Sequence, residues 1–217
     1  MLLAIDCGNT NTVFSIWDGS RFICTLRTST EHQRTADQYF VWFSTLLAHH
    51  RIEANIDAVI ISSTVPRVVF NLRVFADRYF NCRPLVVGKP ECKLPVDVRV
   101  DAGTAVGPDR LVNTVAGFDL YGGDLIMVDF GTATTFDVVD TDGAYVGGVI
   151  APGVNLSLEA LHMAAAALPH VDQVNRHPID TCALRLYSRL GLSNSSTLLN
   201  QAAETGTGDP AAWAFDT

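Results

Sequence analysis

Ile5-Asp6-Cys7-Gly8-Asn9-Thr10 returns in the second half of the chain as Val128-Asp129-Phe130-Gly131-Thr132-Ala133. In both copies a short apolar run ends in aspartate, one further residue, glycine and a small polar residue. An apolar run closed by such a turn signal is typical of a buried β-strand. Because the pattern occurs once in each half, we interpret the pair as an internal duplication.

The sequence around the two copies predicts the same order of elements twice. Each copy is followed by two more apolar runs with an Asp-Gly pair between them, which is a strong hairpin signal. The runs are residues 13–17 and 22–26 around Asp18-Gly19, and residues 134–139 and 145–150 around Asp142-Gly143. A helix is expected after each set of strands, the first capped by Thr35 and the second over residues 154–167.

Further elements are expected between the two sets. Residues 58–62 and 85–87 are apolar runs that predict strands, and Pro66 is placed to open a helix in its first turn. Gly107-Pro108-Asp109-Arg110 is expected to open another helix.

The composition indicates a globular protein. Of the 217 residues, 48% are hydrophobic and 18% are charged, and the formal net charge is −8. A negative surface argues against nucleic-acid and anionic-membrane partners, which bind clustered Lys and Arg. The five cysteines include no C-x-x-C pair, which favours reduced thiols. With no signal-peptide pattern and no run of 18 apolar residues, we expect a cytoplasmic protein.

The two Asp-x-Gly turns have the residue types of a phosphate site. Glycine lets the backbone N–H groups approach an anion closely. Asp6 and Asp129 would face a phosphate only across a cation, which is the usual place of magnesium at a nucleotide. Two such hairpins would hold a triphosphate between two domains. Neutral donors are available in both copies: Asn9, Thr10 and Thr12 in the first, and Thr132, Thr134 and Thr135 in the second.

Two alternatives stay open at this point. Asp, Gly, Asn and Thr are common in ordinary turns, although the matching second copy favours phosphate binding. Asp109 could be an acid that the helix dipole stabilises in a first turn, and the spacing alone favours this interpretation. It could also be a general base that takes a proton from a substrate hydroxyl, with Arg110 binding an anionic group. The P-loop and Rossmann motifs do not occur.

Taken together, four motifs resemble those of type III pantothenate kinases, which belong to the acetate and sugar kinase, Hsp70 and actin superfamily. They are IDCGNTNT from residue 5, GPDR from 107, VDFGTATTFD from 128 and GGVIAPG from 147, and the resemblance covers about residues 1–170. It implies an α/β protein with a duplicated ribonuclease H-like (actin-like ATPase) fold. We expect two similar domains, residues 1–120 and 121–217, each with a mixed sheet and flanking helices.

The resemblance also implies an activity and its residues. The family transfers the γ-phosphate of ATP to the primary hydroxyl of pantothenate, the first step toward coenzyme A. Asp109 is the implied proton acceptor, Asp129 the ligand of a monovalent cation (potassium or ammonium), and Asp6 a magnesium ligand. Family members are homodimers whose substrate site is completed across the interface. The implied ATP contacts are Asp6, Cys7, Gly8, Asn9, Thr10, Asn11, Thr12, Val13 and Thr132, and the implied pantothenate contacts are Gly107, Pro108, Asp109, Arg110 and Thr181.

The chain departs from the family pattern in two places. Val100 stands in the stretch where relatives usually carry a tyrosine ahead of the GxDR motif. Thr181 fits the start of a family helix, but the residues after it do not continue that helix. Residues 192–217 also lack the family's later glycine motif near the adenosine. We hypothesise that the sequence diverges after Thr181 through a change of reading frame, which leaves the second domain incomplete or divergent.

Three functions are therefore compared. The first is an active pantothenate kinase, which the presence of Asp6, Asp109 and Asp129 favours. The second is a catalytically impaired or regulatory protein of the same fold, which the divergent tail favours. The third is a kinase for another small alcohol, such as a sugar, which the short chain argues against.

Overall fold

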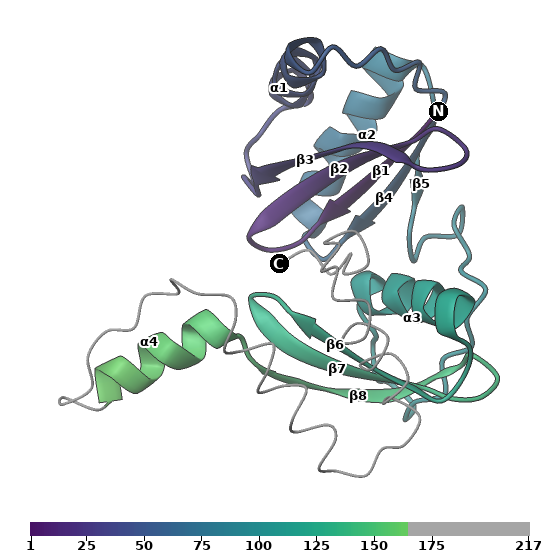
Figure 1. Cartoon of the computed structure of the whole chain (residues 1–217), viewed down its shortest axis with the longest axis vertical. Coiled ribbons are helices and arrows are strands. Elements are labelled where there is room, and N and C mark those ends of the chain that lie inside the picture. The colour runs from purple at the N-terminus through teal and green to yellow at the C-terminus, as the bar shows by residue number, and fades with distance from the viewer. Residues whose placement is uncertain (165–217) are drawn as a thin grey trace, which may run out of the picture. The chain divides into compact units, whose positions relative to one another are not determined.

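The computed structural model describes residues 1–164 of the chain, and these residues belong to two compact units. The first unit consists of Met1–Pro95 with Gly103–Val115, and the second contains Val96–Ala102 and the residues from Ala116 onward. Each unit is built on its own sheet (Figure 1). The predicted limits, 1–120 and 121–217, stay a prediction, since much of the second range lies outside the described residues.

The first unit contains a five-stranded sheet. Its strands are β1 (Leu2–Cys7), β2 (Asn11–Trp17), β3 (Phe22–Ser29), β4 (Ala58–Ser63) and β5 (Leu85–Val86). They lie in the order β3-β2-β1-β4-β5. β2 is antiparallel to β1 and β3, whereas β4 is parallel to β1 and β5 is parallel to β4. This mixed sheet has the strand order expected of a ribonuclease H-like domain.

Two helices of the first unit begin where the sequence predicts. In α1 (Ala36–His49), Thr35 and Gln38 form a capping box, in which the Thr35 hydroxyl accepts from the Gln38 N–H at 3.3 Å. The Thr35 N–H donates to Gln38 Oε1 at 2.8 Å, so two otherwise unpaired amides are satisfied. In α2 (Pro66–Phe80), Pro66 occupies the first turn, where its missing N–H costs no helical hydrogen bond.

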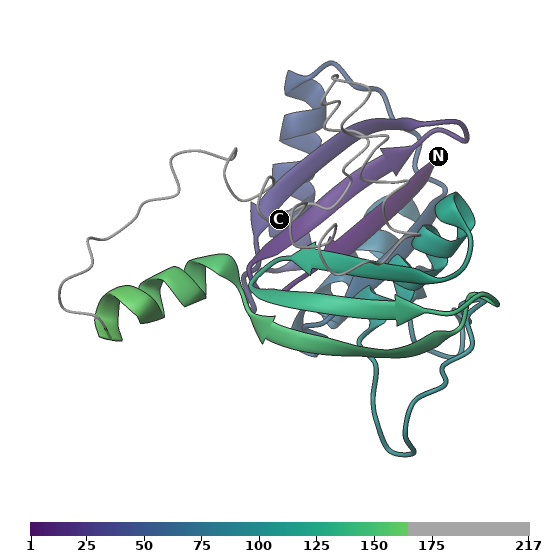
Figure 2. The ribbon, with the colours of Figure 1, turned by 60° about the horizontal axis from the view of Figure 1, so that its bottom comes forward.

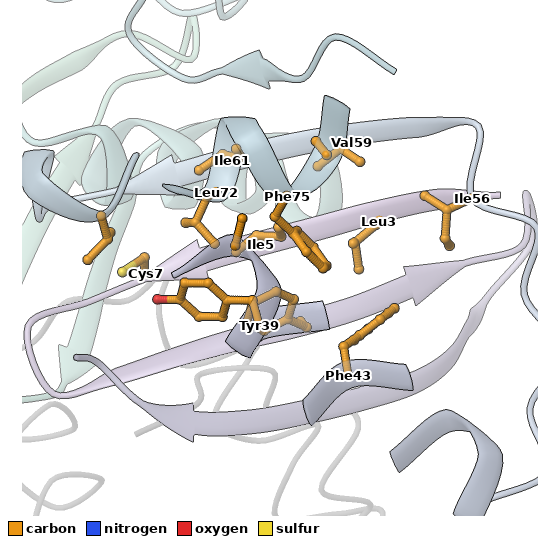
Figure 3. Packing of buried hydrophobic residues seen from close by; sticks show 14 of the residues in the cluster. Leu3, Ile5, Cys7, Tyr39, Phe43, Ile56, Val59, Ile61, Leu72 and Phe75 are labelled. Carbon is orange, nitrogen blue, oxygen red and sulfur yellow. The ribbon is translucent and has the colours of Figure 1, made fainter. Parts of the chain in front are cut away.

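The core of the first unit lies between these helices and one face of the sheet. Leu3, Ile5 and Cys7 alternate along β1 and are all buried. Because successive residues of a strand point to opposite faces, Asp6 is directed to the other face, where it is exposed. The aromatic side chains that pack against the buried row come from both helices: Tyr39, Phe43 and Phe75 (Figure 3).

The second unit contains a three-stranded antiparallel sheet. Its strands are β6 (Leu125–Phe130), β7 (Ala133–Val139) and β8 (Tyr145–Pro152), and they lie side by side in this order (Figure 2). Two helices adjoin it in the chain, α3 (Pro108–Tyr121) before the sheet and α4 (Val154–Ala164) after it. Within residues 1–164 the named strands of this sheet are all antiparallel, and its parallel pairing is limited to one isolated bridge, so the mixed character predicted for the second half stays a prediction.

The segment before α3 joins the second sheet. Val98 forms a parallel bridge with Tyr145, and the Arg99 N–H donates to the Tyr145 carbonyl at 2.8 Å. The Arg99 guanidinium lies 2.6 Å from Asp140 Oδ2. These contacts explain why Val96–Ala102 belongs to the second unit although α3 begins in the first.

The hairpin turns of the two units are built alike. The Oδ1 atom of Asp18 accepts from the N–H groups of Ser20 and Arg21 at 2.7 and 2.9 Å. The Oδ1 atom of Asp140 accepts from those of Asp142 and Ala144 at 3.0 and 2.9 Å. The Arg21 N–H, followed by the hydroxyl and N–H of Ser20, lowers the pKa of Asp18 to about 2. Both predicted hairpins are confirmed, and the shared turn supports the internal duplication.

Two general findings complete the description. The four cysteines among residues 1–164, which are Cys7, Cys24, Cys82 and Cys92, are free thiols. In the same range, no helix has the length and apolar character needed to cross a membrane.

Candidate active site

The first candidate phosphate loop connects β1 to β2. Cys7 and Thr12 are the last paired residues of the two strands, so the loop consists of residues 8–11. The Gly8 N–H donates to the Asn11 carbonyl at 2.9 Å and closes the loop, while Asn9 and Thr10 at its tip are exposed. Backbone and side-chain donors at this tip are therefore accessible to a ligand.

Packing among the described residues does not require a glycine at position 8. Its φ is not among the positive values, and an added Cβ would meet only the Asn11 carbonyl oxygen, at an ordinary 3.5 Å. Gly131, the corresponding residue of the second loop, has the same freedom, because its nearest neighbour would be the Ala133 carbonyl oxygen at 3.5 Å. The open space beside both glycines is what close approach of a ligand to the backbone needs.

Asp6 provides a carboxylate beside the first loop. It is paired with Val13 of β2 and with Ser62 of β4, and it lies exposed on the sheet face opposite the core. Magnesium at nucleotides is usually held by one or two carboxylates, with waters and phosphate oxygens as further ligands. An exposed carboxylate next to a phosphate loop fits that requirement. Within the described residues, no three or more His, Cys, Asp or Glu side chains gather as a preformed metal site.

Thr12 has a different position from the one that its sequence suggests. We expected its hydroxyl among the phosphate donors, but the residue is fully buried. Its Oγ1 lies 3.2 Å from Cys7 Sγ and 2.9 Å from Thr30 Oγ1, on the core side of the loop. The alternation along β2 explains the difference, because Thr12 shares its face with the buried Phe14. The Thr12 side chain therefore supports the loop from the core side.

The second loop connects β6 to β7 and is one residue shorter. Phe130 pairs with Thr134, which leaves residues 131–133, and the Gly131 N–H donates to the Ala133 carbonyl at 3.0 Å. Thr132 is exposed at the tip. Thr134 is only 7% exposed, in the place that Thr12 has in the first loop. Asp129 lies at the end of β6, as Asp6 does near the end of β1.

The third group of candidate residues lies at the beginning of α3. Pro108 is the first helical residue, and the Leu111 N–H donates to the Gly107 carbonyl at 3.2 Å. Asp109 and Arg110 follow in the first turn and are half-buried. Oδ1 of Asp109 lies over Gly107, in space that a Cβ at position 107 would occupy. Because glycine has no Cβ, the Asp109 carboxylate can occupy this space at the start of the helix.

Two residues have a supporting role that the sequence did not assign to them. Thr30 contacts the first loop from the end of β3, and only the register of β2 with β3 could have indicated this. Gly153 lies so close to the carbonyl groups of residues 131 and 132 that a Cβ could not be added without moving backbone. Thr181 lies outside the described residues.

Comparison with known proteins gives consistent results. The family model of the type III pantothenate kinases matches residues 2–184. The type III pantothenate kinase of Roseobacter denitrificans is 85% identical over 172 residues, which cover 79% of this chain and 67% of that protein. The relative from Ruegeria pomeroyi is 81% identical over 172 residues, which cover 79% of this chain and 66% of that protein. The chain thus spans about two thirds of the length of these relatives.

Solved structures with a similar backbone are more distant. The ethanolamine utilization protein EutJ from Carboxydothermus hydrogenoformans has a TM-score of 0.43 and 13% identity, covering 77% of this chain and 57% of that one. The activator of 2-hydroxyisocaproyl-CoA dehydratase from Clostridium difficile has a TM-score of 0.41 and 9% identity, covering 77% and 53%. The family match extends over most of the chain, and from it we conclude that the chain belongs to the type III pantothenate kinase family.

Proposed function

We propose that the protein transfers the γ-phosphate of ATP to the primary hydroxyl of pantothenate, which yields ADP and 4′-phosphopantothenate in the first step of coenzyme A biosynthesis. Membership of the family supports the reaction. The observation that carries the proposal is the open space beside Gly8 and Gly131, which no packing among residues 1–164 explains. Close approach of a ligand to the backbone of each loop accounts for it.

In this proposal the ATP phosphates bind at residues 6–13 and at Thr132. The exposed loop tip offers the amide and hydroxyl groups of Asn9 and Thr10, and glycine permits close approach. Asp6 would hold magnesium through its carboxylate, and the ion supplies positive charge against the phosphate oxygens. Asp129 would bind the monovalent cation, potassium or ammonium.

Pantothenate would bind at Gly107, Pro108, Asp109 and Arg110, with Thr181 as a further contact. Asp109 would accept the proton of the primary hydroxyl while that oxygen forms its bond to the γ-phosphorus and the bond to the ADP oxygen breaks. Arg110 would hold the pantothenate carboxylate, for which its planar guanidinium is suited. The position of the Asp109 carboxylate over Gly107 supports a role for the carboxylate itself, beyond that of a helix-dipole partner.

The proposal includes a setting for the enzyme. We expect a cytoplasmic homodimer whose substrate site is completed by the second subunit, with no nucleic-acid or membrane partner. The net charge of −8 supports the last expectation.

One observation supports a second candidate, a catalytically impaired or regulatory protein of the same fold. The family match ends at residue 184, although the chain has 217 residues. Such a protein would keep the phosphate loops and bind ATP weakly.

Phosphorylation of pantothenate by the purified protein separates the two candidates. We expect turnover that needs ATP and magnesium and is stimulated by potassium or ammonium. Removal of a general base typically lowers the rate by about 10²–10⁴-fold, so Asp109→Asn should lose nearly all activity. Asp119→Asn, an exposed change on the same helix, is the matched control and should keep it. No turnover by the folded protein would contradict the proposal and favour the impaired candidate.

A further inference from the structure

Thr30, just after β3, makes two hydrogen bonds to the first loop. Its hydroxyl donates to the Gly8 carbonyl oxygen at 2.8 Å, and its N–H donates to the Thr10 carbonyl oxygen at 2.8 Å. A single residue, 22 positions from Gly8 in the sequence, thus holds two carbonyl groups of the loop. We infer that Thr30 is a positioning residue for this loop, and the identity of the loop's ligand, ATP, rests on the proposed function.

The two bonds determine where two amide groups point. None of the described peptide bonds is cis, and in a planar trans peptide the N–H points opposite to the C=O. The Gly8 carbonyl shares its peptide unit with the Asn9 N–H, and the Thr10 carbonyl shares its unit with the Asn11 N–H. With both carbonyls directed to Thr30, these N–H groups point away from it. An anion needs such donors and is repelled by carbonyl oxygens, so the bonds to Thr30 present the correct side of the loop.

Hydroxyl protons allow only one arrangement of the bonds on the core side of the loop. Thr30 has one hydroxyl proton, which it donates to the Gly8 carbonyl, so it accepts from the Thr12 hydroxyl at 2.9 Å. The Cys7 thiol lies 3.2 Å from the Thr12 hydroxyl, which can accept its proton, and 3.8 Å from the Gly8 carbonyl oxygen, a second acceptor. Cys7 and Thr12 are fully buried, so water cannot substitute for these partners. The Thr30 hydroxyl is therefore held by a buried neighbour, Thr12, and in turn fixes the direction of the Gly8 carbonyl in the loop.

The second unit has a different residue at the same place. In the register of β2 with β3, Thr30 follows the Asn11–Ser29 pair, and in that of β7 with β8, Gly153 follows the Ala133–Pro152 pair. A Cβ on Gly153 would meet the Gly131 carbonyl oxygen at 2.6 Å, so there the shorter loop lies directly against the neighbouring chain. The first loop is one residue longer, and a hydrogen-bonding side chain takes the place of that direct contact.

Three variants test the role of Thr30. Thr30→Val removes the hydroxyl at nearly constant size, and Thr30→Ser keeps the hydroxyl. Thr25→Val serves as control, because it removes a different hydroxyl from β3, the strand that Thr30 follows, and this hydroxyl lies 3.0 Å from Ser15 Oγ at an exposed position. Amide hydrogen exchange of Gly8 and Thr30, whose N–H groups close the loop, is measured without nucleotide. The KM values for ATP and for pantothenate are measured on the same samples.

We expect Thr30→Val to speed exchange at both amides and to raise the KM for ATP about tenfold, as loss of one hydrogen bond allows. The KM for pantothenate should not change, and Thr30→Ser should behave as the wild type, as should Thr25→Val. Wild-type exchange and KM in Thr30→Val would overturn the inference. So would a loss shared equally by both substrates, because that is the result of a general structural role.

Two further results are also decisive. If the wild type neither binds nor uses ATP, the proposed function fails, and the exchange rates still decide whether Thr30 orders the loop. If Thr30→Val does not fold, Thr30→Ala takes its place with the same expected results. Restoration by serine but not by alanine or valine supports the hydroxyl as the positioning group.

Discussion

Glycines at the candidate site differ in what a side chain would meet. At Gly8 and Gly131 a Cβ would be in ordinary contact with its neighbours, whereas at Gly153 it would meet two backbone carbonyls. Gly107 is intermediate, since the obstacle is the end of the Asp109 side chain, which can move. The missing Cβ thus leaves space for a ligand at Gly8 and Gly131, for neighbouring backbone at Gly153 and for a carboxylate at Gly107.

Alanine at two of these positions should separate activity from stability. Gly107→Ala displaces the Asp109 carboxylate, so we expect a loss of kcat of about tenfold or more, with a nearly unchanged urea midpoint. Gly153→Ala forces backbone to move, so we expect a loss of about 1–3 kcal/mol in the free energy of unfolding. Kinetic assays and urea unfolding of both proteins check this. Equal stability of the two variants, or full activity of Gly107→Ala, would contradict it.

The positions of single residues could be predicted only in part. The Asp-x-Gly turns indicated both loops, and Thr35 and Pro66 indicated the helix starts, because these signals are local. The burial of Thr12 and the bonds of Thr30 could not be predicted, since they depend on which face of β2 packs on the helices and on its register with β3. The position of Asp109 over Gly107 depends on a side-chain rotamer, which no sequence pattern specifies.

At the scale of elements, the helix α2 depends on one aromatic side chain. Phe75 is fully buried and its ring centroid lies 6.0 Å from that of Phe14, 6.0 Å from that of Phe43 and 5.1 Å from that of Phe80. It thereby joins α2 to both α1 and the sheet. Helices of this length depend on such packing more than on their own propensity.

Phe75→Ala should therefore destabilise the first unit. Loss of a buried phenylalanine costs about 3–5 kcal/mol, and we expect the free energy of unfolding to fall by about that amount. Phe70→Ala, on the same helix but with a side chain that is 71% exposed, should change it by less than about 0.5 kcal/mol. Urea unfolding followed by circular dichroism measures both. Similar values for the two variants would show that the aromatic cluster does not stabilise α2.

At the scale of the whole molecule, the sequence stops resembling its family near residue 184. Residues 2–184 match the family model, and the relatives continue well beyond the 172 residues that they share with this chain. The duplicated motifs predicted two related halves, and three consecutive antiparallel strands occur in each, β1–β3 in the first and β6–β8 in the second. The parallel strands expected in the second half could not be assigned from sequence, because the residues after Thr181 lose the family pattern.

A change of reading frame makes a prediction about the gene. Downstream of codon 181, another frame of the genomic DNA should encode a family-like helix and the glycine motif near the adenosine. Sequencing of that region checks this, and the frame upstream, which encodes the 172 matched residues, is the internal control. If neither alternative frame encodes these features, the hypothesis of a change of frame is wrong, and the residues after Thr181 have another origin.

The freedom of Gly8 and Gly131 has a consequence for the history of the chain. Among residues 1–164 no neighbouring atom requires a glycine at either position, which favours selection through a bound molecule. In a lineage that had stopped using that molecule, random mutation would replace them long before it replaced Gly153, which the fold itself requires. Both are glycine in this chain, as we expect of a protein that still binds that molecule.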